Sequence, residues 1–177
     1  MSLNRFRPLR AVLVATAVAL LAGCGFHLRQ SASLPEGMKK IHLTVSGGGK
    51  LERDLARALE NSGAVIVDKP GADSAELAVT SNTFRTDSLT VSGTARVTEY
   101  AVRYHVDFNA RAPDGAVLVP NQSVDMSREF SYDATNTIGT ASQTEELQRS
   151  LIGDMVQSIL FRLQAAGAHQ AAKPAAQ

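Results

Sequence analysis

The sequence predicts an α/β (α+β) two-layer sandwich, in which two helices pack on one face of a mixed, largely antiparallel sheet of four to five strands. Long segments in the middle of the chain alternate apolar and polar residues with the period of two that is typical of strands. Two other segments repeat apolar residues at helical spacing, so each has a single apolar face. Elements with one apolar face bury it against one another, which favours two layers around one core.

The composition excludes several functional classes. The 177 residues include 18 Lys and Arg against 17 Asp and Glu, so the chain lacks the excess of positive charge that nucleic-acid binding requires. The single cysteine, Cys24, can form neither an intramolecular disulfide nor a cysteine-based zinc site. No stretch of about 20 apolar residues occurs, so a helix that spans a membrane is not expected.

The first part of the predicted domain combines a strand, a helix and a short strand. Residues 41 to 45 alternate apolar and polar side chains and are followed by three glycines, which is typical of a strand and a turn. Apolar residues such as Leu51 and Leu55 then recur at helical spacing, and Gly63 has the position of a helix C-terminal cap. Residues 65 to 67 form the short second strand.

Residues 75 to 133 are predicted to form a meander of long strands. In the clearest of them, the apolar side chains share one parity and the polar ones the other, which predicts one covered and one hydrated face. Phe84 has the opposite parity from the apolar residues before it, and this indicates a bulge or a change of face. Arg128 alone interrupts the apolar face of the third long strand. The hydrated face is predicted to carry Glu99, Arg103, His105, Asp107 and Asn109.

The last predicted element is a long amphipathic helix. Its apolar stripe is wide enough to cover most of a sheet face, and this packing role is favoured over exposure at a membrane surface. Ser142 and Glu145 have the spacing of a capping box, so the helix is expected to begin there. Gly167 is expected to end the helix, and the alanine-rich residues 167 to 177 are expected to form a disordered tail.

The start of the chain resembles a bacterial lipoprotein leader. A basic start precedes a short apolar run and the sequence Leu-Ala-Gly-Cys, which ends at Cys24. At such a site the leader is removed, and the cysteine receives a diacylglycerol on its sulfur and a palmitoyl group on its new amino terminus. Three acyl chains hold a protein on a membrane stably, whereas one chain binds only reversibly. An ordinary signal peptide with a cysteine nearby, or a short membrane anchor, is the alternative.

These observations predict a chain divided into four parts. The polar residues after Cys24 include Pro35 and Gly37 and are expected to form a linker. No internal repeat follows them. The predicted parts are a removed leader at 1–23, a lipidated N-terminus and linker at 24–38, a single domain at 39–166 and the disordered tail at 167–177.

The sequence contains no complete catalytic motif. Gly47-Gly48-Gly49-Lys50 superficially resembles a phosphate-binding loop, but the next residue is leucine rather than Ser or Thr. The 4 histidines have no histidine partner four residues away and no nearby carboxylate motif, which disfavours a zinc site. No Gly-x-Ser-x-Gly elbow occurs. The sequence therefore predicts a protein that is not an enzyme and that holds no metal or cofactor.

Several motifs in the chain together resemble those of a single family of lipoproteins. A lipoprotein leader alone is shared by many unrelated proteins, but the residues directly after it are a narrower signal. Gly25 after the cysteine, in place of Asp, also resembles the sorting pattern of outer-membrane lipoproteins. The similarity covers most of residues 24 to 165. It is carried by Cys24-Gly25-Phe26-His27-Leu28-Arg29, by Thr98-Glu99-Tyr100, by the Arg128-x-Phe130 strand end and by the closing helix. Through these residues the chain resembles the LptE family of LPS-assembly lipoproteins.

The resemblance implies a fold of two helices against a mixed four-stranded sheet and a role without catalysis. It implies that the lipoprotein plugs the large LptD β-barrel in a one-to-one complex, assists the folding of that barrel and binds lipopolysaccharide on its way to the cell surface. The implied location is the outer membrane, with the lipid anchor at Cys24 and the domain inside the lumen, facing the periplasm. A domain of this length has a radius of gyration of about 15 Å, so only a barrel of about 26 strands could enclose much of it.

The resemblance also implies that basic residues contact lipopolysaccharide, at the tip of the long hairpin and in the loop before the last helix. Lys and Arg suit this role because they pair well with phosphates. In this chain Arg96 is the first candidate and Arg85 the second. The loop from Glu129 to Gln148 contains no Lys or Arg, so that part of the family pattern is missing. An ordinary charged strand end explains both arginines equally well, and Arg128 is a weaker candidate because an arginine at a sheet margin can simply snorkel.

Two other functions are open at this point. A lipoprotein module of this size can face the periplasm, dock onto a cell-envelope enzyme and activate it, since similar folds serve different functions. Affinity for soluble periplasmic domains rather than for a barrel would favour that function. A lipid-carrying chaperone predicts a deep apolar cavity, whereas the apolar positions here are accounted for by packing of helices on a sheet.

Overall fold

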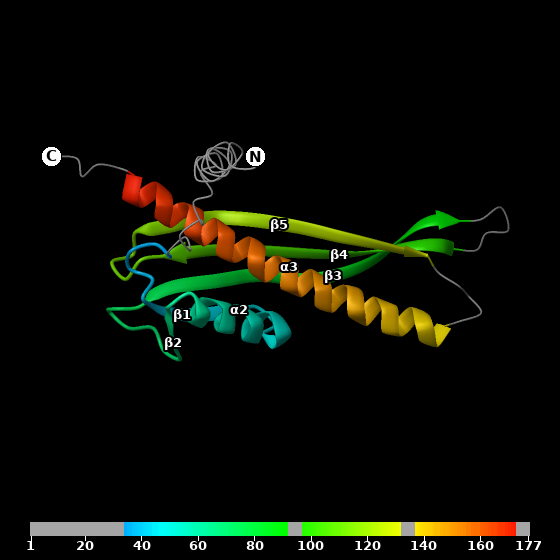
Figure 1. Cartoon of the computed structure of the whole chain (residues 1–177), viewed down its shortest axis with the longest axis horizontal. Helices are drawn as coiled ribbons and strands as arrows, with labels where there is room; N and C mark the ends of the chain where they lie inside the picture. The colour runs from blue at the N-terminus through cyan, green and yellow to red at the C-terminus, as the bar shows by residue number, and fades with distance from the viewer. Residues whose placement is uncertain (1–33, 92–96, 132–136, 173–177) are drawn as a thin grey trace, which may run out of the picture. The chain divides into compact units, whose positions relative to one another are not determined.

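The computed structural model of the chain describes residues 34–91, 97–131 and 137–172. These residues belong to one compact unit, Ala32–Gln177, and form five strands and two helices. The predicted leader at 1–23, Cys24 and the first part of the predicted linker lie outside the described residues. The elements are β1 (Lys40–Val45), α2 (Gly49–Asn61), β2 (Val65–Val67), β3 (Ala75–Val91), β4 (Val97–Arg111), β5 (Val117–Ser131) and α3 (Thr137–Ala172) (Figure 1).

The five strands form one mixed sheet in the order β2-β1-β3-β4-β5. β1 is parallel to both of its neighbours, while β3, β4 and β5 form two successive antiparallel hairpins. α2 connects the parallel strands β1 and β2, and both helices lie on one side of the sheet (Figure 1). The predicted two-layer α+β class is therefore confirmed, with the sheet at the upper end of the expected strand number.

The predicted bulge in β3 is confirmed. The register between β3 and β4 shifts between Val79 and Ser81, and one extra residue moves the following side chains to the opposite face. Phe84 then lies opposite Tyr104, and their rings stack with centroids 3.9 Å apart and planes within 2° of each other. The bulge therefore adds Phe84 to the covered face of the sheet.

The core fills the space between the helices and the covered face of the sheet. Each fully buried large apolar side chain contributes about 1.5–3 kcal/mol relative to exposure, so this layer supplies most of the stability. Packing begins earlier than the predicted domain start at residue 39, because Met38 is buried and Leu34 packs against the core. The largest fully buried side chains are Tyr104, Phe108, Met38, Ile41, Leu51, Leu55, Leu59, Leu77, Leu151, Met155, Ile159 and Leu163.

α2 ends as the sequence predicts. Gly63 has a φ of 91°, in the left-handed region that favours glycine. Its N–H donates to the carbonyl of Glu60, and the N–H of Ala64 donates to the carbonyl of Leu59. These two hydrogen bonds define a Schellman motif, which satisfies carbonyls that the helix end leaves without partners.

The predicted ends of α3 are wrong. The helix begins at Thr137, so Ser142 and Glu145 lie inside it and do not form a capping box. Their three-residue spacing occurs equally at interior helix positions, where it has no capping role. The helix also continues through Gly167 to Ala172, because neighbouring alanines offset the roughly 1 kcal/mol that an interior glycine costs. Residues 173–177 of the predicted disordered tail lie outside the described residues.

α3 is fixed to β5 by polar contacts as well as by packing. Arg128, which interrupts the apolar face of β5, donates from Nη2 to Asp154 Oδ2 of α3 at 2.7 Å. Arg162 of α3 donates from Nη1 to Gln122 Oε1 of β5, also at 2.7 Å. Neither described helix is long and apolar enough to cross a membrane.

Candidate functional site: the polar face of the sheet

The face of β3, β4 and β5 that points away from the helices carries the predicted hydrated residues. Along β4, Val102, Tyr104 and Val106 are fully buried, whereas Arg103 and His105 between them are exposed or half-buried. The strict alternation in the sequence produces this difference, because neighbouring side chains of a strand point to opposite faces. Six charged side chains of this face form two clusters.

The first cluster joins two arginines through one carboxylate. Arg85 of β3 and Arg103 of β4 are directly opposite each other, an arrangement that is unfavourable for two like charges. Arg103 Nε donates to Asp87 Oδ2 at 2.8 Å, and Arg85 Nε lies 3.2 Å from Asp87 Oδ1. Asp87 thus bridges the two guanidinium groups and holds them side by side. We call these three residues the arginine cluster.

The second cluster surrounds His105. Its Nδ1 lies 2.8 Å from Asp125 Oδ1, and its Nε2 lies 3.2 Å from Asp107 Oδ2. The hydrogen bonds to Asp125 and then Asp107 raise the pKa of His105 above its ordinary value. Asp107 also accepts a hydrogen bond from the Ser123 hydroxyl, which together with His105 lowers the pKa of Asp107. The arrangement favours a charged imidazolium between two carboxylates, and we call it the histidine cluster.

An open hollow of about 410 Å³ lies between the two clusters. Most of its lining consists of hydrogen-bond donors, and one carboxylate contributes at the side of the histidine cluster. Neither Asp87 nor Asp107 lines the hollow, so these two carboxylates support the donors from outside it. The lining residues are Thr83, Arg85, Arg103, His105 and Asp125.

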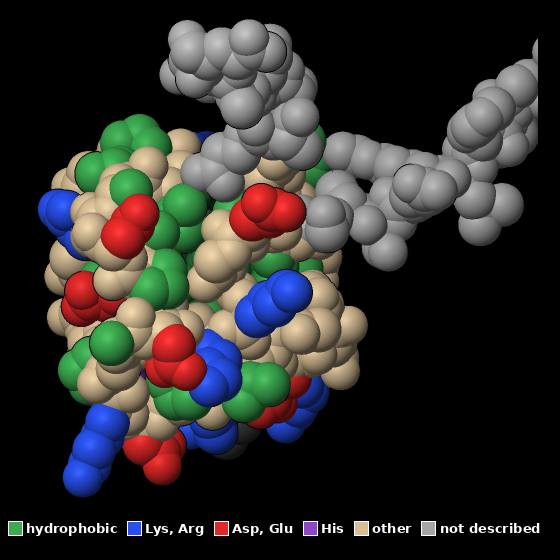
Figure 2. Space-filling model, turned by 90° about the vertical axis from the view of Figure 1, so that its left-hand side faces the viewer, with side chains coloured by type: hydrophobic (Ala, Val, Ile, Leu, Met, Phe, Trp, Pro, Cys, Tyr) green, Lys and Arg blue, Asp and Glu red, His purple; other side chains and the backbone are tan. Residues whose placement is uncertain are grey.

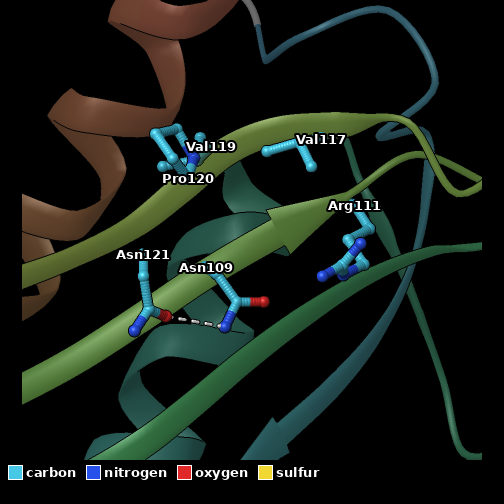
Figure 3. A pocket seen from close by; sticks show the side chains of 6 residues that line it. All are labelled: Asn109, Arg111, Val117, Val119, Pro120 and Asn121. Atoms are coloured by element: carbon cyan, nitrogen blue, oxygen red, sulfur yellow. Dashed lines mark hydrogen bonds between the residues drawn. The ribbon is translucent and has the colours of Figure 1, made fainter.

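A second, smaller hollow of about 260 Å³ lies near the turn between β4 and β5 (Figure 3). The strand register shifts here between Phe108 and Ala110, opposite Pro120, which has no N–H to donate to the strand ladder. Asn109 Nδ2 donates to Asn121 Oδ1 at 3.0 Å. The lining residues are Asn109, Arg111, Val117, Val119, Pro120 and Asn121. The register shift accounts for this smaller hollow. The lining of the hollow combines one basic group with two amides and apolar side chains.

The end of the domain that carries the β4–β5 turn has mixed charge. Figure 2 shows acidic and basic side chains scattered there among apolar ones, with no patch of a single sign on the visible described surface. This distribution agrees with the balanced numbers of acidic and basic residues in the sequence.

The structure places some of the predicted site residues and leaves others undescribed. Arg85 lies on the polar face and is 72% exposed. Arg96 and Cys24 lie outside the described residues. Arg128 points to the helix side, where its ion pair with Asp154 accounts for it structurally. The sequence predicts only that Arg103 lies on a hydrated face, because its position opposite Arg85 depends on strand register. Among the described residues no group of three or more His, Cys, Asp or Glu could hold a metal ion.

The fold is that of a small bacterial lipoprotein domain. The solution structure of an uncharacterized lipoprotein B from Nitrosomonas europaea is similar, with a TM-score of 0.67 and 25% identity over 84% of this chain and 94% of that one. The LPS-assembly lipoprotein LptE of Photorhabdus laumondii is 28% identical over 82% of this chain and 84% of the relative. The LptE of Yersinia enterocolitica is 26% identical over 86% of this chain and 73% of the relative.

The model of the LptE family, described as lipopolysaccharide-assembly, matches residues 38–163. The chain belongs to this family, which confirms the resemblance found in the sequence. Its members are LPS-assembly lipoproteins and not enzymes, and membership indicates an outer-membrane lipoprotein that works with the LPS transport machinery. Most of the matched range is the two-layer domain described above.

Proposed function

We propose that this chain is an outer-membrane lipoprotein that plugs the LptD β-barrel, helps to assemble it and binds lipopolysaccharide during its delivery to the outer leaflet. The complex is one-to-one, the domain lies inside the lumen and faces the periplasm, and acyl chains on Cys24 anchor it. Family membership supports the role in LPS assembly.

The polar face of the sheet is the observation that supports a plug. A protein enclosed by a polar lumen must present polar groups without leaving charges uncompensated, because a buried charge without a partner is costly. Here Asp87 pairs with two arginines and His105 lies between two carboxylates, so the three cations of the two clusters are matched by three carboxylates. The two clusters are therefore polar and balanced in charge when taken together, and they can lie close to a hydrated wall without a large desolvation cost.

A pull-down from the native envelope tests the plug. The tagged, lipidated protein would be purified in mild detergent from its own cells, and the co-purifying chains identified and counted. We expect one very large β-barrel at a ratio of one to one. Recovery of a soluble periplasmic enzyme instead would reject the plug and favour a module that activates an enzyme.

Lipid attachment at Cys24 is tested by mass spectrometry. Mass spectrometry of the mature protein should find an N-terminal Cys24 that carries three acyl chains, and a Cys24→Ser variant should lose them. A mature chain that begins elsewhere or carries no acyl chain would reject the anchor.

Binding of lipopolysaccharide is tested with an Arg85→Ala/Arg96→Ala double variant of the lipidated protein. Arginine pairs well with phosphate, so the double variant should bind purified lipopolysaccharide more weakly. Arg57→Ala is a matched control, because Arg57 lies on α2 and its side chain is 72% exposed, as is that of Arg85. Equal affinity of the double variant and the control would reject the role of these arginines.

A further inference from the structure

We propose that the hollow between the arginine and histidine clusters is a phosphate-binding site, and that Thr83, Arg103 and His105 bind there together with Arg85. The ligand is a phosphate group of the kind that a phosphorylated glycolipid carries. The assignment to a glycolipid rests on the proposed function, whereas the phosphate chemistry of the hollow does not.

The strand register places the four donor side chains in a rectangular array. Thr83 is directly opposite His105, and Arg85 is directly opposite Arg103. The two pairs are two residues apart along the strands and therefore share one face. Opposite side chains in such a pair have Cβ atoms about 5 Å apart, and successive pairs on one face are about 7 Å apart along the strand. Four donors at this spacing surround a space that suits a tetrahedral oxyanion.

The carboxylates around the hollow orient the donors. Asp87 lies within ion-pair distance of the Nε atom of each arginine, and a guanidinium group carries four further N–H donors. Asp107 and Asp125 hold the two ring nitrogens of His105 and favour its charged form. Three cationic groups therefore line the hollow together with one hydroxyl and one carboxylate, Asp125, which is already engaged by His105.

The charge balance predicts how such a ligand binds. Arg85, Arg103 and protonated His105 are matched by Asp87, Asp107 and Asp125, so the net charge of the two clusters is close to zero. Binding must then depend on directed, charge-assisted hydrogen bonds rather than on a long-range positive field. A phosphate group accepts several such bonds at once, whereas a carboxylate offers only two oxygens. The site should therefore prefer phosphate to carboxylate.

The test uses the lipidated mature protein in a nonionic detergent. Affinity would be measured by calorimetry for lipopolysaccharide and for the same lipopolysaccharide after enzymatic removal of its phosphates. In a separate titration, the NMR signals of the His105 ring would be followed with inorganic phosphate and with acetate. Arg103→Gln is the main variant, because it leaves Arg85 and Arg96 in place, and Arg57→Gln is the control. Thermal melts would show whether each variant is folded.

We expect Arg103→Gln to weaken binding of intact lipopolysaccharide about tenfold, which is typical for loss of one charge-assisted hydrogen bond. The variant should bind dephosphorylated lipopolysaccharide as the unmodified protein does, and Arg57→Gln should change neither affinity. Inorganic phosphate should shift the His105 signals, and acetate should shift them less.

The two measurements separate this proposal from the proposed function. Phosphate shifts on His105 without an effect of Arg103→Gln on lipopolysaccharide would assign the site to free phosphate rather than to the glycolipid. Failure of the unmodified protein to bind lipopolysaccharide would reject the glycolipid role, while the phosphate titration would still decide the site. Unshifted His105 signals, with equal lipopolysaccharide affinity in Arg103→Gln and Arg57→Gln, would overturn the proposal.

Discussion

The two faces of the sheet formed by β3, β4 and β5 consist of the same strands, yet different forces act on them. Tyr104 is fully buried beneath the helices, while the next residue, His105, lies in an open cluster of charges. On the covered face each large side chain contributes about 1.5–3 kcal/mol by burial. On the polar face an exposed ion pair contributes about 0–1 kcal/mol. The covered face therefore determines stability, and the polar face is free to serve binding.

Truncation of the covered face should have the largest effect. Phe108 of β4 is fully buried, so Phe108→Ala removes a large apolar side chain and leaves a cavity. We expect the free energy of unfolding to fall by about 3–5 kcal/mol, measured by denaturant titration. A loss below about 1 kcal/mol would contradict the division of roles between the faces.

A partly buried hydrogen bond on the covered face should have an intermediate effect. The Tyr104 hydroxyl donates to Asn82 Oδ1 at 2.8 Å, and Asn82 Nδ2 donates to the carbonyl of Ser46 at 3.2 Å. Tyr104→Phe removes the first of these bonds while keeping the ring stack with Phe84. The free energy of unfolding should fall by about 1 kcal/mol. A double-mutant cycle with Asn82→Ala checks the pair, and additive effects would mean that the bond contributes nothing.

A change in the arginine cluster should have a small effect on stability. Asp87→Asn leaves Arg85 and Arg103 opposite each other without a compensating carboxylate. We expect a loss of less than about 1 kcal/mol, because like charges directly opposite are unfavourable but solvent screens them. Adding Arg85→Gln to Asp87→Asn should recover most of the loss. A loss as large as that of Phe108→Ala would mean that the polar face is part of the folding core.

The pH dependence of His105 should have the smallest effect on stability. Its folded-state pKa lies above the ordinary value of 6.5, so its contribution is fully present below that value and is lost as the pH rises through the folded-state pKa. An NMR titration should give a midpoint for His105 above 6.5. Asp125→Asn should lower this midpoint, because Asp125 is the main cause of the raised pKa. An unchanged midpoint would contradict the ion pair between the two side chains.

Strand parity and helix spacing in the sequence anticipate a large part of the fold. They separate the two faces of β4, place the bulge before Phe84 and identify Gly63 as the end of α2. The limits of α3 are missed, because a spacing of three residues and an isolated glycine are compatible with both the interior and the end of a helix. Helix ends depend on tertiary packing that local patterns do not contain.

Less of the candidate site than of the fold could be predicted from the sequence. The resemblance to LptE pointed to Arg85, and alternation placed Arg103 and His105 on a hydrated face. Nothing in the sequence indicates that Arg103 lies opposite Arg85, or that Asp125 of another strand reaches His105. These pairings depend on strand register, which a single bulge shifts by one residue.

The sequence by itself determined which residues face the core, the balanced charge of the chain and its resemblance to the family. These properties are local, because alternation along one strand separates its two faces whatever lies beside it. Only the tertiary structure decided which charges meet. The array of Thr83, His105, Arg85 and Arg103 exists because β3 and β4 pair in one register, and that register is set by burial of the opposite face.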